Sequence, residues 1–359
     1  MLENFEDREA FHNRMSSVMG WDIGGAHLKA ARLEAGRIVD VVQIASPLWL
    51  GLSELDRAFT EAKMALGSAE RNAVTMTAEL SDTFADRQVG VAAVAEIARR
   101  ELAPQPVLFY AGDRGFVSAD AIVSHTAAVA SANWHASAAL AARHFADGLF
   151  VDIGSTTTDL IPIGAGQVAA RGASDPERMA YGELVYAGVV RSFLMAGLRL
   201  VPFAGRWVTL MNEWFANASD VYRILGELPE GADQMATADG QPKTIVASQA
   251  RLARQIGYDA KDVSAGALTQ LARFFAEAQL REIIDGACLV LSHSDINVKA
   301  PIIGAGVGRF VARRLAERLG RPYVDFDGTI PALPESREKA ADCVPACAVA
   351  LLLEDVNGH

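Results

Sequence analysis

Two segments of the chain carry similar residues in the same order, and those residues suit the binding of phosphate and a metal ion. Residues 20–38 read GWDIGGAHLKAARLEAGRI, and residues 150–168 read FVDIGSTTTDLIPIGAGQV. Asp22 aligns with Asp152, and the isoleucine and glycine that follow also align. An aspartate that ends a buried strand before a glycine leaves backbone N–H groups open to phosphate oxygens, while its carboxylate faces a metal ion or its waters. The repeat therefore predicts two phosphate-binding hairpins that act as a clamp.

The loops of both copies are rich in residues that permit close contact with an anion. Glycine lets a ligand approach the backbone, and serine and threonine supply hydroxyl donors. Lys29 is able to neutralise a phosphate oxygen, and Asp159 either holds the second loop or contacts the metal ion. The predicted phosphate-binding residues are Gly24 and Gly25 in the first loop and Gly154, Ser155, Thr156 and Thr157 in the second.

These side chains need strands and turns to position them. In each copy a short apolar strand ends in Asp-Ile-Gly, a turn of small residues follows, and a second strand leads to a glycine turn. Residues 300–326 read APIIGAGVGRFVARRLAERLGRPYVDF, which predicts a strand, a turn with Gly304 and Gly306, an amphipathic helix and another strand. This turn lacks the full dinucleotide-binding pattern. Together with the two hairpins, it is predicted to form the third wall of a nucleotide or diphosphate cleft.

Two further polar residues each have two interpretations. His27 lies in the first loop, where the second copy has Thr157, so it is either an anion ligand or a structural histidine. Asn133 begins the helix that precedes the second copy, so it is either a cleft residue or the helix N-cap. No histidine pair has the spacing of a zinc site, which confines the metal prediction to carboxylates.

Composition limits the classes of partner. The 359 residues include 44 acidic and 33 basic side chains, which give a formal net charge of −11 at pH 7. Nucleic acids and anionic membranes require a positive surface, so neither is expected as a partner. A small anionic substrate is expected instead, and the sequence leaves a homo-oligomer open.

Length and residue usage indicate the setting of the protein. The length suggests two domains at about 150 residues each. The three cysteines do not form a disulfide framework. The N-terminal segment lacks the apolar core of a signal peptide, and no apolar run reaches the roughly 20 residues of a membrane span. We therefore expect a cytoplasmic protein.

The two hairpins and the later glycine turn, in this order, resemble the actin, Hsp70 and sugar-kinase superfamily. The stretch DIGSTTTDL at 152–160 resembles its hydantoinase A and oxoprolinase branch. Further segments are similar to the tetrahydromethanopterin-linked one-carbon transfer pathway proteins, a group that includes the methanofuran-pathway ether synthases. The segments that carry this similarity are SANWHASA at 131–138, DPERMAYGELVYAGVVRS at 175–192 and DVYRILGELPEGADQMATADG at 220–240. The resemblance covers nearly all of the chain after Met19.

The resemblance implies an α/β fold of two ribonuclease-H-like, actin-like ATPase domains around a central cleft. The first domain is expected at 18–147, after a polar extension at 1–17, and the second at 148–359. The second domain is expected to contain a helical insertion at about 190–286, a glycine-rich turn at 303–308 and a C-terminal helix at 337–355 that returns to the hinge. Strands of the first domain are expected at 18–24, 28–34, 38–45, 72–79 and 106–111.

The resemblance also implies a reaction. The enzyme would be a transferase that joins 5-(aminomethyl)-3-furanmethanol diphosphate to the phenol of γ-glutamyltyramine or tyramine and releases diphosphate. The hairpins would hold the diphosphate, and Asp22 and Asp152 would position Mg²⁺ or a similar cation through water. The implied catalytic residues are Asp22, Lys29, Asp152 and Glu183, the metal-site residues are Asp22, Asp152 and Asp159, and the substrate-binding residues are His27, Asn133, Arg178, Tyr186, Gly304 and Gly306.

Glu183 has an alternative interpretation. It would take the phenol proton or anchor the substrate amine, with Tyr186 stacking on a flat ring. Both residues are predicted in one turn-to-helix segment after the second hairpin. The alternative is a capped helix on which Glu183 and Arg178 pair at the surface.

Other functions remain compatible with the same fold. The chain would bind ATP as a cofactor if it were a kinase or a hydantoinase/oxoprolinase-like hydrolase, or if it were a non-enzymatic ATP-binding module. Tight binding of adenine nucleotides would favour these alternatives. Release of diphosphate only when a furan and a phenol are both present would favour the transferase.

Overall fold

The computed structural model describes residues 17–356, which form two compact units. Unit 1 holds the chain up to residue 146 together with 166–168 and the chain from 326 onward, and unit 2 holds 147–165 and 169–325. The predicted N-terminal extension lies outside the described residues, apart from Ser17, which begins the first strand. In the described chain, no helix has both the length and the apolar character needed to cross a membrane.

The sheet of unit 1 contains the first predicted hairpin. Its strands run in the order β3-β2-β1-β4-β5-β6, and all five strands predicted from the sequence are present. The pairs β1–β2 and β2–β3 are antiparallel, whereas β1–β4 and β4–β5 are parallel. The strands of this sheet are β1 Ser17–Ile23, β2 His27–Glu34, β3 Arg37–Ala45, β4 Arg71–Met76, β5 Val107–Tyr110 and β6 Phe116–Ser118. The short strand β9 Gln167–Val168 is not part of this sheet and packs on α5.

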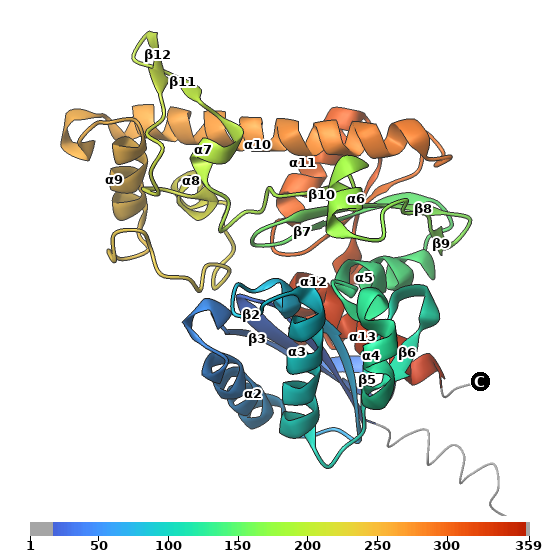
Figure 1. Ribbon diagram of the computed structural model, residues 1–359. Helices are drawn as coiled ribbons and strands as arrows, with labels where there is room; N and C mark the ends of the chain where they lie inside the picture. The colour runs from blue at the N-terminus through green and yellow to red at the C-terminus, as the bar shows by residue number, and fades with distance from the viewer. Residues whose placement is uncertain (1–16, 357–359) are drawn as a thin grey trace, which may run out of the picture. The chain divides into compact units, whose positions relative to one another are not determined.

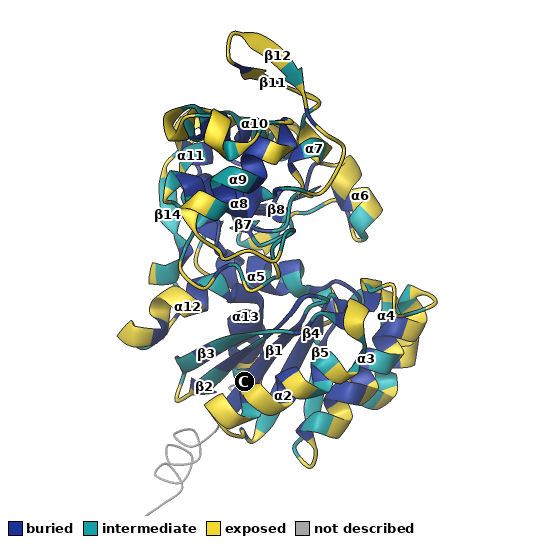
Figure 2. Ribbon diagram, turned by 90° about the vertical axis from the view of Figure 1, so that its left-hand side faces the viewer, coloured by how far each residue is buried: buried dark blue, intermediate teal, exposed yellow. Residues whose placement is uncertain are grey.

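Helices cover both faces of this sheet. Alternate residues of β1, such as Met19 and Trp21, face the core formed with α2 and α3, whose outer surfaces are exposed (Figure 2). The intervening residues face α13, and Gly20 lies so close to it that a Cβ would stand 1.9 Å from the Ala346 carbonyl oxygen. The helices are α2 Ser53–Leu66, α3 Arg87–Leu102, α4 Ile122–Val129, α5 Asn133–Ala142, α12 Arg337–Asp342 and α13 Val344–Val356.

The sheet of unit 2 repeats this topology around the second hairpin. Its strands run in the order β10-β8-β7-β13-β14. The pairs β7–β8 and β8–β10 are antiparallel, whereas β7–β13 and β13–β14 are parallel. The strands are β7 Gly148–Ile153, β8 Thr158–Gly164, β10 Leu184–Val185, β13 Ile302–Ala305 and β14 Tyr323–Asp325. The shared strand order and directions confirm the predicted pair of ribonuclease-H-like sheets.

The predicted insertion in unit 2 is longer than expected and includes strands. The long helix α10, orange in Figure 1, passes the predicted end at Gly286 because its buried residues Ile283, Ala287 and Val290 continue at helical spacing. The strands β11 Leu200–Phe203 and β12 Arg206–Thr209 form a separate hairpin. The helices of unit 2 are α6 Asp175–Ala180, α7 Leu194–Gly197, α8 Ala218–Leu225, α9 Ile245–Gln255, α10 Ala265–His293 and α11 Arg309–Leu319.

The C-terminal segment differs from the prediction in two ways. The second domain was predicted to extend to residue 359, but unit 2 ends at Asp325 and residues from 326 onward belong to unit 1. The reason is that α13 buries most of its residues against β1, β2, β4 and α5 of unit 1. The single helix predicted at 337–355 is two helices, because Cys343 has a non-helical backbone at φ −123° and separates α12 from α13.

Candidate functional site

The second predicted phosphate loop is a tight turn between β7 and β8. The Gly154 N–H donates to the Thr157 carbonyl at 2.9 Å and closes the turn. The four turn residues are partly exposed, and the hydroxyls of Ser155 and Thr156 lie 3.4 Å apart. The backbone and hydroxyl groups of this turn are therefore open to a ligand.

The end of the segment 175–192, for which the sequence analysis predicted no contact at Gly188, Val189 or Arg191, supports this loop. The Val189 N–H donates to the Gly154 carbonyl at 3.1 Å, and the Arg191 N–H donates to the Ser155 carbonyl at 2.7 Å. A Cβ at Gly188 would lie 2.4 Å from the Thr156 nitrogen, so the segment is able to approach the loop only because this residue is glycine. Burial lowers the pKa of the Arg191 guanidinium. No sequence motif marks Gly188.

The later glycine turn packs directly against the end of β7. Ala305 pairs with Asp152, and the Gly308 N–H donates to the Ile153 carbonyl at 2.8 Å. Gly306 has a φ of +79°, and a Cβ there would lie 2.3 Å from Asp152 Oδ1. The structure thus brings Asp152 and Gly306 together. Gly304 faces elsewhere, because a Cβ on it would stand 2.6 Å from the Tyr323 side chain.

Asp159 is held by a buried arginine on the segment after β8. Arg178 Nη2 lies 2.5 Å from Asp159 Oδ1, and the arginine side chain is only 2% exposed. The same Nη2 donates to the Glu183 carbonyl oxygen at 3.2 Å. Of the two roles considered for Asp159, the structure shows contacts for holding its own hairpin, and a contact with a metal ion stays a prediction.

Asp159→Asn is expected to lower the free energy of unfolding by about 2–3 kcal/mol, because it leaves the buried Arg178 charge without its carboxylate partner. Urea unfolding followed by circular dichroism measures the change. Asp285→Asn is the matched control, because it removes one carboxylate from the exposed pair Arg281–Asp285 and should cost about 0.5 kcal/mol or less. Equal stability of the two variants would contradict the assigned role of Asp159.

Glu183 is an internal anchor of unit 2. It is fully buried, and its carboxylate accepts hydrogen bonds from the backbone N–H groups of Arg171 at 2.6 Å and Gly172 at 3.0 Å. The surface pair with Arg178 considered from the sequence is not formed, because both side chains are buried. A role of Glu183 in proton transfer or amine binding stays a prediction.

The segment from 181 to 186 is not the predicted turn-to-helix segment. Helix α6 ends at Ala180, Gly182 has a φ of +77°, and the chain then pairs with β8 as strand β10. A left-handed residue stops a helix and redirects the chain, which explains the difference. Tyr186 follows the strand and is 55% exposed.

The first predicted phosphate loop closes in the same way as the second. The Gly24 N–H donates to the His27 carbonyl at 3.0 Å, and a Cβ at Gly24 would lie 2.9 Å from that oxygen. Gly25 has no neighbour within 4 Å of an added Cβ. Asp22 pairs with Lys29 across the two strands, and the Lys29 Nζ lies 3.7 Å from Asp22 Oδ2. Lys29 therefore has its charge beside the predicted metal-site carboxylate.

Two other predicted residues lie in unit 1. His27 begins β2 and is buried, with 6% of its surface exposed. Asn133 is the first residue of α5, whose N-cap is Ala132, so the N-cap interpretation of Asn133 is wrong by one position. Its Oδ1 accepts a hydrogen bond from the Trp134 N–H at 2.8 Å. Contacts of either residue with a ligand stay predictions.

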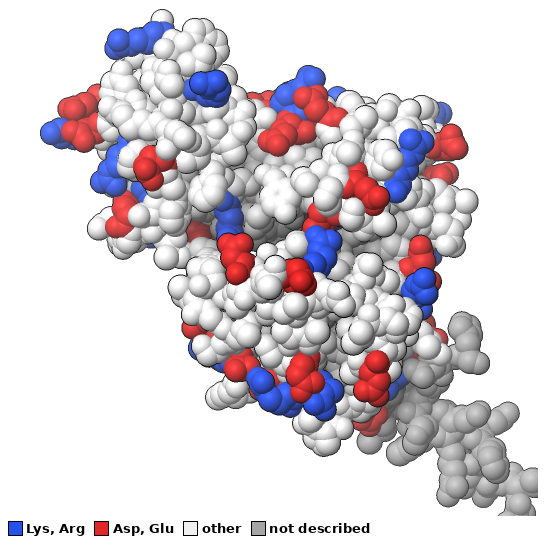
Figure 3. All heavy atoms as spheres, viewed as in Figure 1, with Lys and Arg blue, Asp and Glu red and all other residues white. Residues whose placement is uncertain are grey.

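The predicted site residues divide between the two units. Hairpin 1, with Asp22 and Lys29, belongs to unit 1, and hairpin 2, with Asp152 and the glycine turn, belongs to unit 2. That both hairpins hold one diphosphate stays a prediction. On the face shown in Figure 3, acidic and basic side chains are interspersed.

Carboxylates such as those of Asp22 and Asp152 are the ligands that a hard cation such as Mg²⁺ prefers, and Mg²⁺ usually keeps several water ligands. Within residues 17–356, no three His, Cys, Asp or Glu side chains form a metal-binding cluster. Mg²⁺ commonly binds through one or two carboxylates together with waters and substrate phosphates. Asp22 in unit 1 and Asp152 in unit 2 each lie next to a phosphate-type turn, and a metal ion shared by these two carboxylates stays a prediction.

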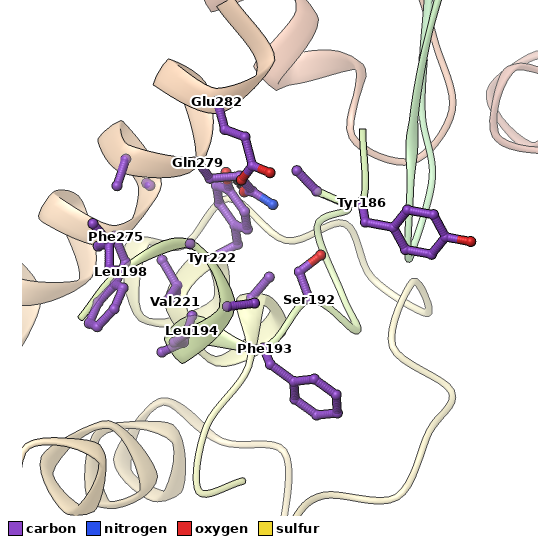
Figure 4. Close-up of a pocket in the computed structure, with 16 residues that line it drawn as sticks. Tyr186, Ser192, Phe193, Leu194, Leu198, Val221, Tyr222, Phe275, Gln279 and Glu282 are labelled. Carbon is purple, nitrogen blue, oxygen red and sulfur yellow. Dashed lines mark hydrogen bonds between the residues drawn. The ribbon is translucent and has the colours of Figure 1, made fainter. Parts of the chain in front are cut away.

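A pocket in unit 2 adjoins the segment that supports the second loop. The pocket is open to solvent on one side, and its space is about 690 Å³ when the solvent at its mouth is included. Figure 4 shows Gln279 and Glu282 extending from α10, whereas the rings of Tyr186 and Phe193 point outward. Sequence reasoning identified none of these residues except Tyr186. The pocket is lined by Tyr186, Ala187, Ser192, Phe193, Leu194, Ala196, Gly197, Leu198, Ala218, Val221, Tyr222, Phe275, Ala276, Ala278, Gln279 and Glu282.

Comparison with known proteins identifies relatives along most of the chain. The family model described as hydantoinase/oxoprolinase matches residues 70–329. A protein of Methanocaldococcus jannaschii is 27% identical over 297 residues, which are 82% of this chain and 87% of the relative. A protein of Methanococcus vannielii is 33% identical over 117 residues, which are 33% of this chain and 52% of the relative. Both relatives are named (4-{4-[2-(γ-L-glutamylamino)ethyl]phenoxymethyl}furan-2-yl)methanamine synthase.

A solved structure shares the fold. The nucleotide-free acetone carboxylase aligns with 85% of this chain and 67% of its own, with a TM-score of 0.58 and 12% identity. At this identity the similarity shows the fold alone.

Proposed function

This chain belongs to the hydantoinase/oxoprolinase family, and on that basis we propose that it is a transferase that forms an aryl ether in the biosynthesis of a methanofuran-type cofactor. The observation that carries the proposal is the similarity to the Methanocaldococcus jannaschii synthase, which covers 82% of this chain and 87% of the relative.

The product in the relative's name defines the bond to be made. The name describes a furan that bears an aminomethyl group and is joined through a methylene carbon to a phenol oxygen. We propose that the methylene carbon enters as its diphosphate ester. The carbon–oxygen bond to diphosphate breaks, the phenol oxygen bonds to the same carbon, and the phenol proton leaves to a base or to water. Diphosphate departs with the electron pair of the broken bond.

The second hairpin is suited to bind the leaving diphosphate. Its turn residues are partly exposed and carry N–H and hydroxyl donors, and the backbone of Val189 and Arg191 supports the turn. Hydrogen-bond donors that are already oriented toward the negative charge developing on the diphosphate lower the energy barrier for the departure of diphosphate. When bound, Mg²⁺ would supply further neutralisation of the diphosphate, with Asp22 and Asp152 as its protein ligands through water.

The proposed reaction predicts that diphosphate is released only when both substrates are present. Purified protein, Mg²⁺, 5-(aminomethyl)-3-furanmethanol diphosphate and tyramine or γ-glutamyltyramine should yield equal amounts of diphosphate and ether, measured by a coupled diphosphate assay and mass spectrometry. Omitting either organic substrate should leave only background release.

The alternative functions give different results in the same assay. An ATP-dependent kinase or hydrolase would consume ATP without the furan, and an ATP-binding module would bind adenine nucleotide without turnover. Either result, together with no ether formation, would reject the transferase.

A further inference from the structure

Most polar side chains of the pocket beside the second hairpin already form hydrogen bonds within the protein. Gln279 Oε1 accepts from the Tyr222 hydroxyl at 2.5 Å, and Gln279 Nε2 donates to the Gly188 carbonyl at 2.7 Å. The Ser192 hydroxyl accepts from the Gly188 N–H at 2.7 Å. Glu282 has no cationic side chain within ion-pair distance among the described residues. Its carboxylate is thus the main polar group left for a ligand.

Glu282 lies where a ligand in the pocket would meet it. A Cβ added to the pocket residue Gly197 would lie 3.5 Å from Glu282 Oε2, so the carboxylate rests along the pocket wall. The residue is exposed at the mouth, yet partial desolvation raises the pKa of its carboxylate. A cation in the pocket would compensate that loss of hydration. An anion would be repelled, so the pocket is unsuitable for the diphosphate itself.

The remaining walls favour a flat apolar group. Val221 and Phe275 are buried and line the interior with Leu194 and several alanines. An aromatic ring would bury apolar surface against these walls while its polar substituent remained at the mouth.

Gly188 connects this pocket to the phosphate loop. Its carbonyl and N–H bond to the pocket residues Gln279 and Ser192, while its Cα presses against the backbone of Ser155 and Thr156. The pocket wall and the phosphate loop are therefore in contact at Gly188. This arrangement suits a substrate that reacts at the anion-binding loop.

We propose that the pocket binds a protonated primary amine that a short chain attaches to an aromatic ring, with Glu282 as its counter-ion. The assignment deepens the proposed ether synthesis, because both the aminomethylfuran and tyramine belong to this chemical class. Glu282 is a binding residue in this proposal, and the reacting atoms lie toward the second hairpin.

Binding without turnover tests the proposal. Isothermal titration calorimetry should show that the full-length protein binds tyramine or 5-(aminomethyl)-3-furanmethanol at least about 10-fold more tightly than the matching alcohol, in which a hydroxyl replaces the amine. Glu282→Gln keeps the shape of the side chain and should abolish this preference. An alcohol that binds as well as the amine, or a preference retained in Glu282→Gln, would overturn the proposal.

Two further variants test whether the amine preference depends on this pocket and not on the overall charge of the helix. Asp285→Asn removes a negative charge from the same helix outside the pocket and should retain the amine preference. Ala196→Trp, at an exposed position on the pocket wall, should block amine and alcohol alike without changing the thermal midpoint. If a folded Ala196→Trp protein binds the amine normally, the pocket is not the binding site.

The ether assay distinguishes the two amine sources. Glu282→Gln should raise KM about 10-fold or more for the substrate whose amine occupies the pocket and leave KM for the other substrate unchanged. An unchanged KM for both would overturn the assignment even if ether synthesis is intact. Conversely, if the protein binds the amine more tightly than the alcohol but forms no ether, the proposed function is rejected and the assignment of the amine site is retained.

Discussion

Asp152→Asn is expected to lower the rate of diphosphate release by about 1,000-fold and to leave the thermal midpoint nearly unchanged. The substitution keeps the size of the side chain, so the close packing against Gly306 is preserved, but it removes the charge that is proposed to hold a Mg²⁺–diphosphate complex. Coupled assays of kcat and calorimetric titration with Mg²⁺ and inorganic diphosphate measure both effects.

Asp159→Asn provides the matched control for this prediction. Asp159 is the register partner of Asp152 across β7 and β8, and its carboxylate pairs with the buried Arg178 side chain. Asp159→Asn should therefore reduce stability, whereas Asp152→Asn is expected mainly to lower turnover. A folded Asp152→Asn protein with more than one tenth of the wild-type turnover would reject the proposed role of Asp152.

Gly188→Ala is expected to lower turnover by about 100-fold and to reduce the free energy of unfolding by about 1–3 kcal/mol. The added Cβ would lie 2.4 Å from the Thr156 nitrogen and 2.5 Å from the Ser155 carbonyl carbon, so the loop and the segment must separate. Displaced N–H donors no longer match the position of the leaving diphosphate. Turnover and urea unfolding should be measured on the same preparation.

Gly266→Ala is the control for the glycine substitution. Gly266 is near the start of α10, and an added Cβ would have no neighbour within 4 Å. Alanine is favoured over glycine in a helix, so this variant should be as stable as the wild type or slightly more stable, with normal turnover. If Gly188→Ala behaves in the same way, the close approach to the loop has no functional role.

Much of the fold was predictable because its signals are local. The Asp-Ile-Gly turns predicted both hairpins, since tight turns depend on neighbouring residues, and the family resemblance that they carry implied the five strands of unit 1. The C-terminal helices were assigned to the wrong unit. Helical periodicity identifies a buried face but does not say which sheet covers it, and close contacts such as Gly20 with Ala346 settle that.

In the candidate site, too, local residue patterns were predictable from the sequence and contacts between distant residues were not. Sequence alone determined the duplicated loops, the carboxylates that precede them and the family resemblance, because these depend on residue types at short spacing. Tertiary structure alone decided that Gly188 supports the second loop, that Arg178 holds Asp159, and that Glu282 lines a pocket. These contacts join residues far apart in the chain, such as Gln279 and Gly188 at a separation of 91 positions. Packing of whole elements brings such residues together, and no local pattern records which partners will meet.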